Sequence, residues 1–180
     1  MTNNKSVFGI FLKRTDVESA IDGLKAAGFS NADVSVLLPE NVSSGELATE
    51  QSTKAPAGAA VGVGSGAAVG GALGWLVGIG ALAIPGIGPV VAAGPLLAAL
   101  AGIGIGGAFG GFAGSLVGLG IPEYQAKEYE GQMMKGRILV AVRGETAEQA
   151  DRAKQVLNKS GARDIVVSRE TAEGTAQNAA

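Results

Sequence analysis

The densest group of side chains able to do acid–base chemistry in this sequence follows Pro122. Three carboxylates and one amine stand close together there: Glu123, Lys127, Glu128 and Glu130. On a short helix they are expected to form a solvated or headgroup-level face rather than a catalytic pair. Cysteine and histidine are absent, which removes thiol nucleophiles, thiolate metal sites and the commonest general base. We therefore predict that the protein is not an enzyme and has no catalytic, metal or cofactor site.

Two short glycine motifs resemble phosphate-binding loops. They run over residues 62–67 (GVGSGA) and 102–107 (GIGIGG). A phosphate-binding loop of this kind follows a strand and opens a helix. Neither motif follows a credible strand, and both belong to a longer glycine pattern, so we do not expect nucleotide binding.

The longer pattern lies in residues 55–122, which contain no charged side chain. Glycines recur there every four residues in two rows, and residues four apart share one face of a helix. Such small-residue faces let helices pack closely in membranes. The predicted helix-packing residues are Gly62, Gly66, Gly70, Gly74, Gly78, Gly102, Gly106, Gly110, Gly114 and Gly118.

Interior glycines cost roughly 0.8–1 kcal/mol each in an aqueous helix, whereas in lipid the backbone must be helical or form a closed barrel. We therefore predict a glycine-zipper transmembrane hairpin over 58–120, with spans at about 60–84 and 96–120 and a turn containing Pro85 and Pro89. Two alternatives remain: a soluble hairpin buried in an oligomer, and a disordered or re-entrant tract. Positive charges lie only outside the hairpin. The positive-inside tendency then places both termini in the cytoplasm of a bacterium, with the protein in the inner membrane.

The two flanking segments share a strand–helix–strand pattern. Residues 6–40 form the first unit, with a capping box at Thr15 and Glu18 and a glycine stop at Gly28. Residues 121–170 add a short helix and the second unit, with a capping box at Thr146 and Gln149. The segments 41–57 and 171–180 are predicted to be a flexible linker and tail. The predicted fold is α+β: a ferredoxin-like four-stranded sandwich with helices on one face, interrupted by the transmembrane hairpin.

Three stretches of the chain are similar to a known family. They are residues 6–11 (SVFGIF), the helix end 26–29 (AAGF) with 34–37 (VSVL), and 120–142, beginning GIPEY and ending ILVAV. In these stretches the chain resembles the bacterial general stress proteins, described as heat-induced or low-temperature-induced proteins with a YflT-like domain. The resemblance implies a small stress-induced, membrane-associated protein without established enzymatic activity, and it carries no catalytic residues over.

The expected function is that of a non-enzymatic, stress-associated membrane protein that self-associates through its glycine rows. Its expected partners are the lipid bilayer and further copies of itself. Nucleic acid is not expected, because the net charge is −2 and no basic face is concentrated. One alternative is a pore- or lesion-forming polypeptide. The other is a soluble oligomer or ligand-sensing module with the hairpin as its buried core, and the sequence names no small-molecule ligand. Tyr124 and Tyr129 either lie at the membrane boundary or pack on the sheet.

Overall fold

The structure is a computed structural model that describes residues 5–39, 75–76, 80–84, 87–94 and 112–169. Its first half contains β1 (Lys5–Phe11), α1 (Arg14–Ala26) and β2 (Val34–Pro39). The uncharged part of the chain supplies β3 (Gly80–Ile84), β4 (Gly88–Ala93) and α4 (Phe112–Gly118). The second half contains α5 (Glu123–Met134), β5 (Ile138–Gly144), α6 (Ala147–Lys159) and β6 (Arg163–Arg169).

The strands form one six-stranded sheet in the order β3-β4-β2-β5-β1-β6. Every neighbouring pair is antiparallel. The two halves of the chain interleave, because β5 lies between β2 and β1. Strands β3 and β4, which come from the uncharged part of the chain, extend the same sheet beyond β2.

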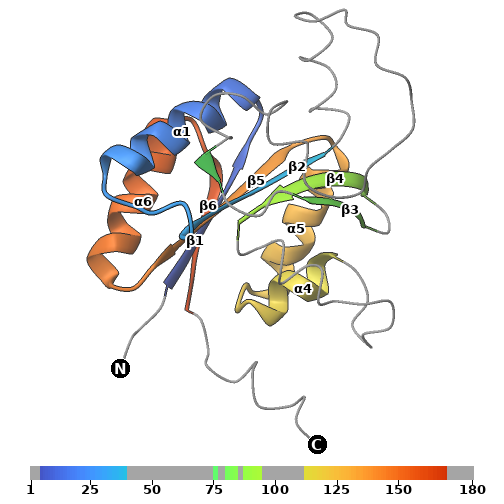
Figure 1. Cartoon of the computed structure of the whole chain (residues 1–180). Coiled ribbons are helices and arrows are strands. Elements are labelled where there is room, and N and C mark those ends of the chain that lie inside the picture. Colours follow the sequence, from blue (N-terminus) through green and yellow to red (C-terminus); the bar gives the residue numbers. More distant parts are fainter. Residues whose placement is uncertain (1–4, 40–74, 77–79, 85–86, 95–111, 170–180) are drawn as a thin grey trace, which may run out of the picture.

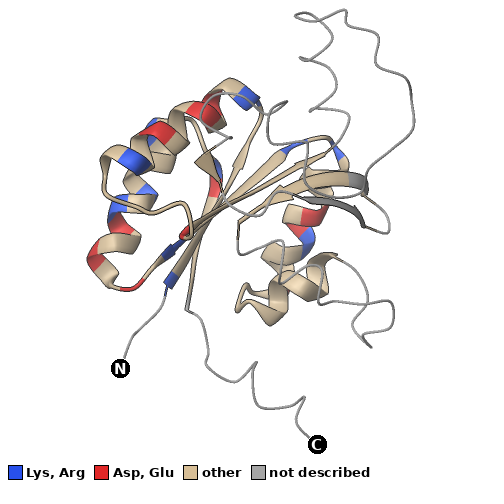
Figure 2. Cartoon of the chain, in the orientation of Figure 1, with Lys and Arg blue, Asp and Glu red and all other residues tan. Residues whose placement is uncertain are grey.

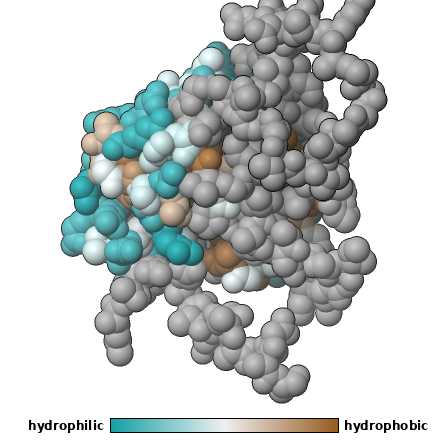
Figure 3. All heavy atoms as spheres, viewed as in Figure 1, coloured by the Kyte–Doolittle hydropathy of each residue, from teal (hydrophilic) through white to brown (hydrophobic). Residues whose placement is uncertain are grey.

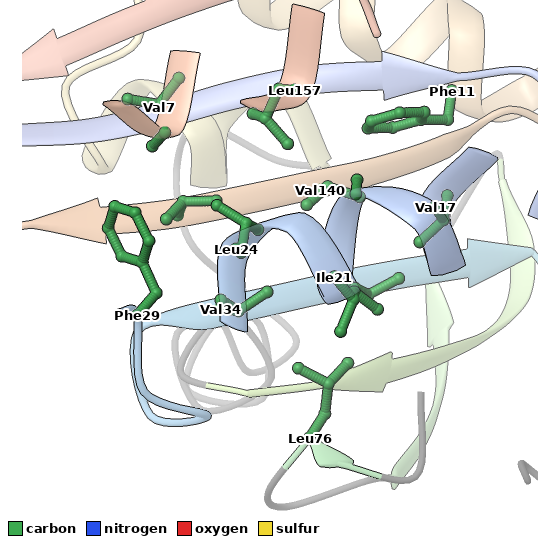
Figure 4. Close-up of a cluster of buried hydrophobic side chains, with 14 of the residues drawn as sticks. Val7, Phe11, Val17, Ile21, Leu24, Phe29, Val34, Leu76, Val140 and Leu157 are labelled. Carbon is green, nitrogen blue, oxygen red and sulfur yellow. The ribbon is translucent and has the colours of Figure 1, made fainter. Parts of the chain in front are cut away.

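Helices cover both faces of the sheet: α1 and α6 lie on one side, and α4 and α5 on the other (Figure 1). Strand β5 shows why, since its side chains from Ile138 to Val142 alternate between two buried clusters. Ile138, Val140 and Val142 join the cluster under α1 and α6, where Val17, Ile21, Leu24 and Leu157 pack (Figure 4). Leu139 and Ala141 join the cluster under α4 and α5. The domain therefore has three layers.

The predicted fold is wrong. The sheet has six strands rather than four, and helices cover both of its faces rather than one. Two of those strands come from within the proposed hairpin. The stretch near Pro85 that was predicted to turn between two helices instead links the paired strands β3 and β4. The apolar side chains of Leu76, Val90 and Phe112 are buried in the two clusters of the domain. They therefore contact other protein side chains, whereas the prediction placed them in lipid.

The membrane prediction is contradicted too. Among the residues that the structure describes, no helix is long and apolar enough to cross a bilayer. Helix α4 has seven residues, whereas a crossing helix needs about 20. This overturns the transmembrane hairpin with spans at 60–84 and 96–120, and with it the predicted place in the bacterial inner membrane with both termini cytoplasmic. Apolar side chains of this block that the structure describes as buried, among them Leu76, Val90, Phe112 and Leu116, lie in the core of the domain.

The two predicted capping boxes have different outcomes. At α6 the predicted cap residue is confirmed: the backbone amide of Gln149 donates to Thr146 Oγ1 at 3.2 Å. The reciprocal bond differs from a capping box, because the side chain of Gln149 accepts at 2.7 Å from the backbone amide of Glu145 instead of that of Thr146. At α1 the prediction is wrong, because the helix begins at Arg14 and its cap residue, Lys13, makes no side-chain cap bond.

Candidate functional site

The uncharged elements β3, β4 and α4 are the part of the described chain that best matches the predicted contact surface. None of them contains Lys, Arg, Asp or Glu, whereas α1 and α6 carry charges of both signs along their lengths (Figure 2). In Figure 3 the side of the molecule formed by α1 and α6 is mostly hydrophilic. The three elements themselves therefore carry none of the charge on the described chain, whereas α5, which packs beside α4, carries Glu123, Lys127 and Glu128.

Two of the ten predicted packing glycines lie within the described residues. Gly114 and Gly118 are both on α4, one turn apart, so they share a face of that helix. A Cβ atom added to Gly118 would meet no atom within 4 Å. Val117 beside it is 41% exposed although it is apolar. Helix α4 thus presents an open, uncharged face next to a buried one formed by Phe112 and Leu116.

The other eight predicted packing glycines lie outside the described residues: Gly62, Gly66, Gly70, Gly74, Gly78, Gly102, Gly106 and Gly110. The same is true of the two motifs that resemble phosphate-binding loops, at 62–67 and 102–107. Their role in helix packing stays a prediction.

The most perturbed polar group that the structure describes is the phenol of Tyr129 on α5. Tyr129 is 1% exposed, and its hydroxyl donates to the main-chain carbonyl of Asp164, with the Phe8 carbonyl at 3.5 Å as a second acceptor. Asp164 has a positive φ of 51°, a conformation that non-glycine residues rarely adopt. It lies where the β1–β6 register shifts, since two steps along β1 (Phe8 to Ile10) face three along β6. This register shift is a β-bulge. The Tyr129 hydroxyl therefore donates its hydrogen bond to a main-chain carbonyl of the bulge, that of Asp164.

Burial raises the pKa of Tyr129 well above its ordinary value, and the nearby carboxylates of Asp164 and Glu128 add to the effect. The phenol is therefore held protonated, as a hydrogen-bond donor to the backbone. A group in this state is neither a nucleophile nor a base near neutral pH. Tyr129 packs on the sheet, which was one of the two positions expected for it.

The group of charges after Pro122 lies on the outside of α5. Lys127 Nζ is 2.8 Å from Glu123 Oε1, one turn away, and both side chains are about two-thirds exposed or more. The hydrogen bond from Lys127 lowers the pKa of Glu123. Glu128 is also exposed. The predicted solvated face is therefore found for Glu123, Lys127 and Glu128, whereas Glu130 is half-buried. Among the described residues no group of three or more carboxylates is placed to hold a metal ion.

Sequence reasoning missed one contact of the uncharged stretch. Lys25 Nζ of α1 lies 5.1 Å from the centroid of the Trp75 ring, within the range of a cation–π interaction. Trp75 is partly buried against the α1 side of the core, with Leu76 beside it buried there. No local pattern connects residues this far apart along the chain.

No protein-family model, no curated protein and no solved structure matches this chain.

Proposed function

We propose that the protein is a non-enzymatic module that acts by self-association, with the open face of α4 as part of the contact between copies. The observation that carries the proposal is Gly118, an exposed helical glycine with free space at its Cβ position, in an element without charge. A second backbone can approach such a position closely. Val117 would lose exposed apolar surface in the same contact.

The energetics of this face favour a protein contact. Bringing a charged surface into an interface requires that its charges lose water, which is costly unless each one finds a partner. The face of α4 carries no such charge. The small net charge of −2 also leaves two copies with little mutual repulsion.

The link to stress is part of the proposal and rests on the resemblance to the bacterial general stress proteins. The non-enzymatic part is supported by the absence of cysteine and histidine from the chain and by the commitment of the Tyr129 hydroxyl to backbone carbonyls.

Sedimentation velocity of the full chain over a range of protein and salt concentrations tests the proposal. We expect the average mass to rise with protein concentration and to change little with salt, because an uncharged contact is not weakened by screening. A single monomeric species at every concentration would contradict self-association.

Two matched glycine substitutions test the role of α4. Gly118 and Gly131 both lie in helices, and neither would place a Cβ within 4 Å of another atom. Gly118→Leu is expected to weaken the association by blocking close approach, whereas Gly131→Leu, on the charged helix α5, should leave it unchanged. Equal effects of the two variants, or none, would exclude the α4 face from the contact.

A further inference from the structure

The six-stranded sheet has two edges, and they differ. An edge strand carries unpaired amide and carbonyl groups and can accept another strand, which natural proteins discourage with charges, bulges and irregular backbone. In the described chain β6 pairs with β1 alone, and β3 pairs with β4 alone. One edge carries these protective features and the other carries none.

The β6 edge is irregular and charged. Its sequence, RDIVVSR, contains three charged residues. Asp164 lies at the bulge with a positive φ, and its main-chain carbonyl accepts a hydrogen bond from the Tyr129 hydroxyl. An irregular strand held in this way is a poor template for pairing, because a new strand would have to follow the same irregularity.

The β3 edge is regular and uncharged. Its sequence is GALAI, without charge or proline. Five consecutive residues, Gly80 to Ile84, pair with β4 from Ala92 to Gly88 without a shift in register. A straight antiparallel ladder of this kind leaves the amide and carbonyl of every second residue of β3 directed outward, in the regular pattern that a further antiparallel strand needs.

We propose that β3 pairs with β3 of a second copy, so that two sheets join into one across a two-fold axis. This inference rests on the proposed self-association and adds a strand to the contact that is proposed for the face of α4. All neighbouring pairs in the sheet are antiparallel. A two-fold axis perpendicular to the sheet makes the two copies of β3 antiparallel as well, so the pairing pattern continues across the interface. Strand addition of this kind draws its affinity from main-chain hydrogen bonds.

A second copy fits this edge better than a charged partner does. The β3–β4 hairpin has no side chain that could pair with a lysine or a carboxylate, whereas an identical uncharged strand leaves no charge unpaired. The two-fold relation also makes the contact self-complementary and closed, which limits the assembly at this edge to a dimer.

Substitutions at Ala83 in β3 test the pairing by sedimentation equilibrium. Ala83→Lys and Ala83→Asp each place like charges near one another across the two-fold axis, and each is expected to weaken the dimer at least about tenfold, which corresponds to 1.4 kcal/mol. Mixing the two variants should restore dimers that contain one copy of each. Val167→Lys places a charge on the other edge, β6, where Val167 is 40% exposed, and this control variant should leave the dimer intact.

Hydrogen exchange of the unmodified protein gives a readout that needs no variant. The outward amides of β3 are expected to gain protection as the protein concentration rises, and those of β6 are not. Protection of β3 in a monomer, independent of concentration, would mean that another segment of the same chain covers the edge and would overturn the inference.

The outcomes separate the two proposals. A protein that is monomeric at every concentration contradicts both. A protein that self-associates, is weakened by Gly118→Leu and is unaffected by either Ala83 variant contradicts the β3 pairing alone.

Discussion

The buried hydroxyl of Tyr129 gives a sharp prediction, because it connects α5 to the bulge in β6. Tyr129→Phe removes one oxygen atom and keeps the ring in place in the cluster under α4 and α5. The carbonyls of Asp164 and Phe8 then lose the donor that the hydroxyl supplies.

The size of the effect follows from the burial of these groups. A typical hydrogen bond contributes about 0.5–1.5 kcal/mol, and a buried acceptor left without its donor costs about 1–3 kcal/mol. We expect Tyr129→Phe to lower the free energy of unfolding by roughly 1–3 kcal/mol. For a chain of this length each kcal/mol lowers Tm by about 2–4 °C.

The raised pKa adds a pH dependence with a definite sign. The folded state holds the Tyr129 phenol protonated, whereas the unfolded chain releases that proton near pH 10. The stabilisation is therefore complete below about pH 10 and is lost as the pH rises from there toward the higher folded-state pKa. Over that window Tyr129 should make the free energy of unfolding fall by about 1.4 kcal/mol per pH unit.

Urea unfolding of three proteins, at neutral pH and above about pH 10, measures both effects. Tyr124→Phe is the matched control, because Tyr124 lies on the same helix and is 69% exposed; its cost should stay within about 0.5 kcal/mol. The wild type should lose stability above pH 10 more steeply than Tyr129→Phe does. If Tyr129→Phe matched Tyr124→Phe in stability and the wild type in alkaline slope, the hydroxyl would not be bonded to the bulge.

Three further predictions test the way the chain folds, each by chemical denaturation with far-UV circular dichroism. Gly94→Ala should destabilise the domain by roughly 2–5 kcal/mol. Gly94 has φ +86°, and the Cβ of an alanine there would overlap the Val34 carbonyl oxygen. An unchanged unfolding midpoint would mean that this turn does not approach β2. Leu76→Ala should cost about 2–5 kcal/mol, since Leu76 is 6% exposed in the core under α1, and a negligible cost would separate the uncharged stretch from the domain. Thr146→Ala should cost about 0.5–2 kcal/mol through loss of the α6 cap, whereas Thr15→Ala, inside α1, lacks a cap to lose; equal costs would contradict this assignment of caps.

The sequence by itself determined the local elements of the two halves. The cap at Thr146 could be predicted from the sequence because its partner Gln149 is three residues away. The helix ends at Gly28 and Gly161 could be predicted too, and both glycines have positive φ. Such signals depend on neighbours within one helical turn. They say where α1 and α6 lie in the chain without saying what covers the sheet.

One signal for the second helical layer was present in the sequence. The run Ile138–Val142 is apolar at every position, which is typical of a strand buried on both faces. A sheet with helices on one face alone would alternate apolar and polar side chains there. The sequence predicted that Gly114 and Gly118 lie on one helix face, and the structure places both on α4; their role in helix packing stays a prediction. The hydrogen bond from Tyr129 to Asp164 could not be predicted, because it joins residues 35 apart along the chain.

Tertiary contacts alone decided the conformation of the described part of the uncharged stretch. A run of apolar and glycine residues without charge has the same hydropathy whether lipid or protein surrounds it, so sequence pattern could not distinguish a transmembrane hairpin from β3, β4 and α4. What distinguishes them is the pairing of β4 with β2 and the burial of Val90 and Phe112 against the sheet. The paired residues of β4 and β2 are more than 50 positions apart along the chain, and only the folded chain brings them together.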